Sequence, residues 1–391
     1  MLAPSFIVFG DDWGAHPSSV QHLFRRIARD HRTLWVNTVG LRPPRLDARD
    51  AARVVRKLRA IVRPPPATAS TTSGSDGLDL HVVAPPMVPW MRPSALRALN
   101  RASVRAAVGR AAERLGLRDP VVVTTVPNGV DGRGVAGSRS LVYYCVDDFA
   151  AWPGIDRIAA ESLERELLAC CDGVLATSAR LAETRKPARG TVTLLPHGVD
   201  VAHFAKARDA ATVPWSGVRR GRPVLGYLGL VDARLDVPLL AAVARARPDW
   251  DLVFVGPTDV APDPRLTGSN VRFVPAVPYA RLPEVLAAFD VALLPYERNE
   301  LTRSINPLKL REYLASGVPV VATPLPEVLR YAPEVGLGDT TESFVAAVEA
   351  ALAGPRDRRD ARAELLHGES WDDRAGTFLA RCREVLEGAS R

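Results

Sequence analysis

The chain has 391 residues, more than one hydrophobic core usually supports, so we expect two domains. Its 47% hydrophobic and 24% charged residues are typical of a globular protein, and no apolar run approaches the ~20 residues that a membrane-spanning helix requires. The net charge of +7 fits an anionic partner, which would be a nucleic acid, an anionic membrane or a phosphorylated substrate.

The four cysteines, Cys145, Cys170, Cys171 and Cys382, form no C-x-x-C pair, and no histidine cluster accompanies them. We therefore expect buried, reduced thiols in a cytoplasmic protein and no metal site. The N-terminal residues have no basic region and lead directly into a strand-like run, so we interpret them as the first strand instead of a signal peptide.

The first half of the chain alternates strand-like and helical segments, an order typical of a parallel sheet. Strands are expected at 5–10, 33–38, 80–83, 120–126, 140–146, 172–178 and 192–195, and helices at about 18–29, 94–115 and 155–171. The glycines after the first strand do not follow G-x-G-x-x-G, so the dinucleotide fingerprint of an oxidoreductase is missing.

A strongly basic segment follows the second expected strand. Residues 42–63 hold eight Arg or Lys and two Asp, with Val54, Leu58 and Ile61 at helical spacing. We expect a basic amphipathic helix at 49–63, suited to an anionic membrane surface. A solvated helix on a basic protein is the alternative.

The second half repeats the α/β alternation. Residues 201–222 show no sustained period and are expected to connect two domains, at 1–200 and 201–371. Strands are expected at 223–229, 251–255, 271–274, 290–294 and 319–323, and helices after Asp236, at 279–289 and from Asn306 to Gly317. A last helix at 372–391 is expected to pack back on the first domain.

The segment from Asn306 to Gly317 has the residues of a ligand site. We expect Asn306 as N-cap, Pro307 at the first helical position and Gly317 as the stop. Lys309 and Glu312 are three residues apart and so share one helical face. Backbone amides and Lys309 suit phosphate oxygens, and Glu312 suits ribose hydroxyls. A plain surface ion pair is the alternative.

Four blocks of this half together resemble the donor domain of GT-B-fold nucleotide-sugar glycosyltransferases, in the retaining family 4 group. They are LGYLG at 225–229, DLVFVGP at 251–257, DVALLP at 290–295 and KLREYLASGVPVVAT at 309–323. The resemblance implies two Rossmann-like parallel-sheet domains facing across a cleft. It also implies metal-independent transfer of a sugar, with retention, from a nucleotide diphosphate to a glycan, lipid-linked or small-molecule acceptor, with no cofactor.

The resemblance assigns roles to single residues. Glu312 stands at the second glutamate of the E-x7-E motif, which binds the nucleotide ribose. Lys309 and Arg234 are the expected diphosphate ligands, with backbone amides at Gly229 and from Asn306 onward. These groups would neutralise the leaving diphosphate in place of a metal.

Three further residues bear on the sugar. Asp147 and Asp148, after the strand 140–146, are expected to orient the acceptor hydroxyl or the donor sugar, with a turn-capping role as the alternative. Ser304 stands where the first glutamate of E-x7-E holds sugar hydroxyls, so the donor sugar stays open; Glu297 or Glu300 is a candidate substitute.

Other functions are compatible with these residues. The same fold serves nucleotide-sugar epimerases, and the serine at 304 fits a binding protein that has lost catalysis. No nucleic-acid recognition motif is present. We expect a cytoplasmic transferase of cell-surface glycan biosynthesis, peripheral on the inner face of the membrane.

Overall fold

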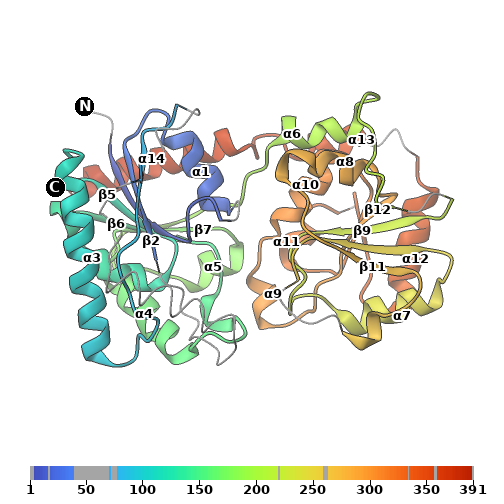
Figure 1. Cartoon of the computed structure of the whole chain (residues 1–391), viewed down its shortest axis with the longest axis horizontal. Coiled ribbons are helices and arrows are strands. Elements are labelled where there is room, and N and C mark those ends of the chain that lie inside the picture. The colour runs from blue at the N-terminus through green and yellow to red at the C-terminus, as the bar shows by residue number, and fades with distance from the viewer. Residues whose placement is uncertain are drawn as a thin grey trace. The chain divides into compact units, whose positions relative to one another are not determined.

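The computed structural model describes residues 4–15, 18–38, 70–71, 77–218, 221–258, 263–332, 334–355 and 359–389. The chain forms two compact units, one of residues 1–196 with 374–391 and the other of residues 197–373. Each unit has its own sheet flanked by helices (Figure 1). The basic helix predicted at 49–63 lies outside the described residues.

The first unit contains a sheet in the order β3-β4-β2-β1-β5-β6-β7-β8. All neighbouring strands are parallel except β3, which pairs antiparallel with β4. The strands are β1 (Phe6–Gly10), β2 (Thr33–Asn37), β3 (Ser70–Thr71), β4 (Leu80–Val83), β5 (Val121–Thr124), β6 (Ser140–Cys145), β7 (Gly173–Ala176) and β8 (Thr191–Leu194). The seven predicted strands are confirmed, and the short edge strand β3 was missed.

Helices cover both faces of this sheet, because its strands are apolar on both sides. They are α1 (Ser19–Ile27), α3 (Ser94–Arg114), α4 (Arg157–Cys170), α5 (Ala179–Thr184) and α14 (Trp371–Ala389). Along β1, Phe6 and Val8 belong to one core with residues of α1 and α14. Ile7 and Phe9 belong to the other, with residues of α3 and α4. The strand period of two therefore divides one strand between two cores.

The final helix completes the first of these cores. The fully buried Phe378 ring lies 5.6 Å from the Phe24 ring, 6.1 Å from Tyr144 and 6.3 Å from Phe6, measured between centroids. Residues at the far end of the chain thus cover the first strand (Figure 1).

The second unit contains an all-parallel sheet in the order β11-β10-β9-β12-β13-β14. Its strands are β9 (Val224–Leu228), β10 (Asp251–Val255), β11 (Val271–Val274), β12 (Val291–Leu294), β13 (Val320–Ala322) and β14 (Val335–Leu337). Its helices are α6 (Val201–Ala205), α7 (Val237–Ala246), α8 (Leu282–Ala287), α9 (Glu300–Ser304), α10 (Leu308–Ser316), α11 (Pro326–Leu329), α12 (Thr341–Ala353) and α13 (Arg359–Glu364). The five predicted strands are confirmed, and β14 was missed.

The prediction of an irregular connector at 201–222 was wrong in its first part. The Asp200 carboxylate accepts a hydrogen bond from the His203 amide at 3.1 Å and caps α6. Phe204 is fully buried, and the His203 ring stacks on Tyr279 with centroids 4.6 Å apart. A helix of five residues is too short to show a helical period, so only its cap and its buried anchor mark it.

Replacing Phe378 by Ala is expected to lower the free energy of unfolding of the first unit by about 3–5 kcal/mol, because it opens a cavity among aromatic rings. Urea denaturation followed by far-UV circular dichroism measures the change. Arg383→Ala, an exposed position on the same helix, is the matched control and should change the transition little. Equal effects of both variants would contradict a core role for α14.

Candidate functional site

Two glycines end neighbouring strands at the carboxyl edge of the second sheet. The chain runs from β9 to β10 on one side, while β12 lies on the other, and such a switch point is where open α/β sheets bind ligands. Gly229 and Gly256 have φ of +134° and +146°, which a side chain would strain. A Cβ on Gly256 would lie 2.2 Å from the Gly229 carbonyl oxygen, so the two strand ends need both glycines.

Helix α10 begins beside these strand ends, one residue later than predicted. Its N-cap is Pro307, and no side chain caps its first amides. Asn306 is not the N-cap. Its buried amide donates to Glu327 Oε2 at 3.4 Å and accepts from the guanidinium of Arg311, which is itself buried and needs an acceptor. Gly317 ends the helix with φ of +73°, as predicted.

Lys309 extends from the first turn of α10 over Gly229. A Cβ at Gly229 would lie 2.0 Å from Lys309 Cε and 2.7 Å from Nζ, so only glycine leaves room for the lysine. The ammonium lies 5.5 Å from the centroid of the Tyr227 ring, which stabilises a cation. Within the described part of the chain, no carboxylate reaches ion-pair distance of Lys309.

Glu312 follows one turn later and is half-buried. Its carboxyl group makes no hydrogen bond with any described residue. Burial raises its pKa to about 7, although Lys309 opposes the rise. A ligand that donates hydrogen bonds to this buried carboxylate would stabilise its ionised form.

Arg234 lies in the loop after β9 and is held by Asp232. Its Nη2 is 2.6 Å and its Nε 2.9 Å from the Asp232 oxygens, and its guanidinium lies 5.5 Å from the Tyr296 ring centroid. Burial alone would lower its pKa, but Tyr296 and Asp232 outweigh burial and raise it above the ordinary value. The predicted diphosphate ligand therefore carries its own counter-charge.

Tyr296 lies near both Arg234 and Lys309. The Arg234 guanidinium is 5.5 Å from its ring, and its hydroxyl is 3.5 Å from that of Tyr227, whose ring the Lys309 ammonium approaches. Burial would raise the pKa of this phenol, yet the charges of Lys309 and Arg234 lower it. The structure therefore brings together residues that are far apart in the sequence. We call them the strand-end cluster, which consists of Gly229, Arg234, Tyr296, Lys309 and Glu312.

Three residues of this region were missed by the sequence reading. Tyr296 lies two residues after the end of β12, and its place at the carboxyl end of a strand was the available signal. Tyr313 accepts a hydrogen bond from the Leu228 amide at 2.9 Å and donates to the Leu228 carbonyl at 3.3 Å, which fixes α10 to the end of β9. The pairing of Asp232 with Arg234 had no signal beyond proximity in the chain.

The predicted acids Asp147 and Asp148 lie in the first unit, just after β6. Asp148 is 9% exposed and accepts from Arg185 Nη2 at 2.7 Å. Arg185 Nε also lies 3.2 Å from Glu164 Oε2, and the Tyr143 hydroxyl donates to Glu164 Oε1 at 2.8 Å. Asp148 is thus part of a buried charge network, and Asp147 beside it is half-buried.

The described residues contain neither a metal-binding group nor a membrane-spanning helix. No group of three or more His, Cys, Asp or Glu among them is arranged to hold a metal ion. In the same part of the chain, every helix is too short or too polar to cross a membrane.

Part of the chain is similar to known glycosyltransferases. Residues 222–354 match the family model described as glycosyl transferases group 1. A protein of Bacillus subtilis (strain 168), named as a candidate teichuronic acid biosynthesis glycosyltransferase, TuaH, is 29% identical over 196 residues. The match covers 47% of this chain and 49% of TuaH, so the chain spans about half the length of that curated relative.

Solved structures match over nearly the whole chain. The sucrose-phosphate synthase of Thermosynechococcus elongatus has a TM-score of 0.70 at 16% identity, covering 98% of this chain and 100% of that one. Anabaena HepE in complex with UDP-glucose has a TM-score of 0.64 at 13% identity, covering 98% and 100%. The predicted GT-B fold is confirmed, and the second unit contains a glycosyl transferases group 1 domain.

Replacing Glu312 by Gln is expected to raise the free energy of unfolding by about 1–3 kcal/mol at pH 8, and by less at pH 5. The folded-state pKa of about 7 exceeds the ordinary value of 4.5, so protonated Glu312 contributes stability at low pH that is lost as the pH rises through 7. Glutamine stays neutral and avoids this loss. Urea denaturation at both pH values measures the free energy of unfolding. An equal increase in this free energy at pH 5 and pH 8 would contradict the raised pKa of Glu312.

Proposed function

We propose that this protein is a glycosyltransferase that moves a sugar from a nucleoside diphosphate to an acceptor. The observation that carries the proposal is the strand-end cluster, in which Lys309 and Glu312 lie at the carboxyl end of β9 inside the segment that matches glycosyl transferases group 1. Among the described residues, Lys309 has no carboxylate partner and the Glu312 carboxyl group has no hydrogen-bond donor. The two groups are therefore complementary to a diphosphate and a ribose.

Each residue of the cluster has a role in this proposal. The ribose hydroxyls donate to Glu312, which then ionises fully. Lys309, the uncapped first-turn amides of α10 and the Gly229 backbone contact the diphosphate. Arg234 exchanges Asp232 for a phosphate oxygen. Positive charge fixed beside the leaving diphosphate stabilises the charge that develops there as the glycosidic bond breaks.

Two acids that follow β6 are assigned to the sugar and the acceptor. Asp147 and Asp148 orient the acceptor hydroxyl or the donor sugar, and the reaction retains configuration without a metal. Because Arg185 holds Asp148 in an ion pair, that carboxylate is fixed in position and suits orientation. The acceptor is a glycan, a lipid-linked molecule or a small molecule, and the protein acts at the cytoplasmic face of a membrane. The match to TuaH, which is named for teichuronic acid biosynthesis, supports a role in cell-surface glycan synthesis.

Calorimetric titration with UDP and with GDP is expected to show binding of at least one nucleotide, and Glu312→Ala should weaken it about 10- to 100-fold through loss of charge-assisted hydrogen bonds. Lys309→Ala should have an effect of the same order. Glu342→Ala and Lys206→Ala, which remove exposed charges elsewhere in the second unit, are the matched controls.

The same titration has a pH signature. Ribose hydroxyls need the ionised carboxylate, so affinity should rise between pH 6 and pH 8 as Glu312 ionises, and this dependence should disappear in Glu312→Gln. Undiminished binding in Glu312→Ala, or binding of neither nucleotide, would remove the donor site.

A turnover assay separates the transferase from its alternatives. With UDP- and GDP-sugars and a bacterial lipid extract as acceptor, we expect nucleotide release that depends on the extract. Asp148→Asn should lower the rate at least about tenfold while nucleotide affinity stays unchanged, because positioning errors of this kind reduce rate. Conversion of the donor sugar without acceptor would indicate an epimerase. Binding without turnover would indicate the inactive binding protein that Ser304 makes possible.

A further inference from the structure

Helix α3 of the first unit has an unusual charge pattern. From Ser94 to Ala112 it contains no acidic residue, while it carries Arg97, Arg101, Arg105 and Arg110. A solvent-facing helix usually mixes both signs of charge. The four arginines therefore need an explanation.

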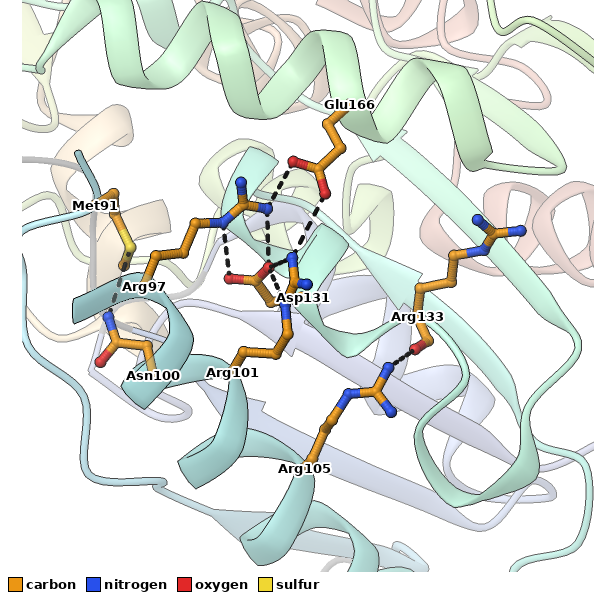
Figure 2. Close-up of polar contacts among 8 residues, drawn as sticks. All are labelled: Met91, Arg97, Asn100, Arg101, Arg105, Asp131, Arg133 and Glu166. Atoms are coloured by element: carbon orange, nitrogen blue, oxygen red, sulfur yellow. Dashed lines mark hydrogen bonds and ion pairs between the residues drawn. The ribbon is translucent and has the colours of Figure 1, made fainter. Parts of the chain in front are cut away.

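Two of these arginines hold the helix in place. Arg97 and Arg101 converge on Asp131, which is 4% exposed, with nitrogen–oxygen distances of 2.9 and 2.8 Å (Figure 2). Both also approach Glu166 of α4, at 2.7 and 3.6 Å. Two cations and two carboxylates balance, so this network sets the orientation of α3 without leaving net charge.

The outer side of the helix is different. We define the α3 face as the exposed residues Ala95, Ala98, Leu99, Ala102, Arg105, Ala106 and Arg110. At helical spacing the alanines and Leu99, which is 59% exposed, form a narrow apolar stripe between Arg105 and Arg110. Arg105 donates only to the Arg133 carbonyl, at 2.8 Å (Figure 2), and Arg110 has no carboxylate partner among the described residues.

An exposed aromatic lies in the segment just before α3. The segment before α3 is tied to it, because the Asn100 amide makes two bonds of 2.8 Å with the backbone of Val88. The Ser103 hydroxyl donates to the Pro86 carbonyl at 2.7 Å. Trp90, in the same segment, is 46% exposed. Indole rings with one wet and one apolar side favour membrane–water interfaces.

The overall charge is divided unequally between the units. The first unit holds 31 Arg and Lys against 20 Asp and Glu, whereas the second holds 20 against 24. The proposed nucleotide site lies in the acidic unit, so it does not account for the basic character of the protein. The positive charge belongs to the unit that carries α3.

We propose that the first unit docks on a bilayer of anionic phospholipid through the α3 face. Arg105 and Arg110 contact headgroup phosphates, and Leu99 enters the interface. A stripe of alanines offers less apolar area than a stable protein interface needs, whereas arginines along a helix suit a plane of repeated phosphates. The proposal does not depend on glycosyl transfer, and it is separate from the segment 49–63.

Flotation with vesicles of phosphatidylcholine containing 30% phosphatidylglycerol tests the proposal on the full chain. We expect binding that falls with salt and is absent from pure phosphatidylcholine vesicles. Arg105→Gln/Arg110→Gln should weaken partitioning at least about tenfold, and Arg105→Lys/Arg110→Lys should restore it. The control Arg180→Gln/Arg245→Gln removes two exposed arginines from other helices and should leave partitioning unchanged.

Several outcomes would overturn the proposal. One is equal partitioning of wild type and Arg105→Gln/Arg110→Gln; another is loss of binding only when the arginines of 49–63 are neutralised. Dimerisation in sedimentation experiments that Leu99→Ser abolishes would assign the face to a second protein copy instead. Circular dichroism melting checks that each variant folds, which is expected because neither arginine contacts a buried carboxylate.

Discussion

The second unit depends on the close approach of α10 to the end of β9. Gly229 provides the space that Lys309 occupies, and Tyr313 binds both backbone groups of Leu228. Together these contacts place Lys309 and Glu312 of α10 over the end of β9, where Gly229 has no side chain. Any side chain at Gly229 would displace the lysine, and the strand-end cluster would no longer form.

The cluster is held in an energetically unfavourable state. Glu312 lacks a hydrogen-bond donor among the described residues, and burial raises its pKa. Groups that are desolvated and incompletely paired are typical of sites that wait for a ligand. Around them, buried ion pairs support the helix. Arg311, next to Glu312 in the chain, donates to Glu369 at 2.7 Å, and this rigid layer keeps α10 in position.

The two units share an α/β architecture but differ in net charge and in where their polar groups are concentrated. The second unit has the strand-end cluster at the carboxyl end of β9, and it contains slightly more acidic than basic residues. The first carries the excess of arginine, and its acids are mostly engaged, as Asp131 and Asp148 show. A division of this kind separates the group that would hold a nucleotide from the surface that would meet an anionic partner.

The sequence alone determined the parallel strands, the glycine stop at Gly317 and the spacing of Lys309 and Glu312, because these features are local and follow from period, turn chemistry and helix geometry. It placed the cap wrongly at Asn306, since the need of buried Arg311 for an acceptor is a tertiary fact. Only the tertiary structure decided that Tyr296 lies between two cations and that β9 needs a glycine under a lysine. Such contacts join residues dozens of positions apart, and no local pattern records them.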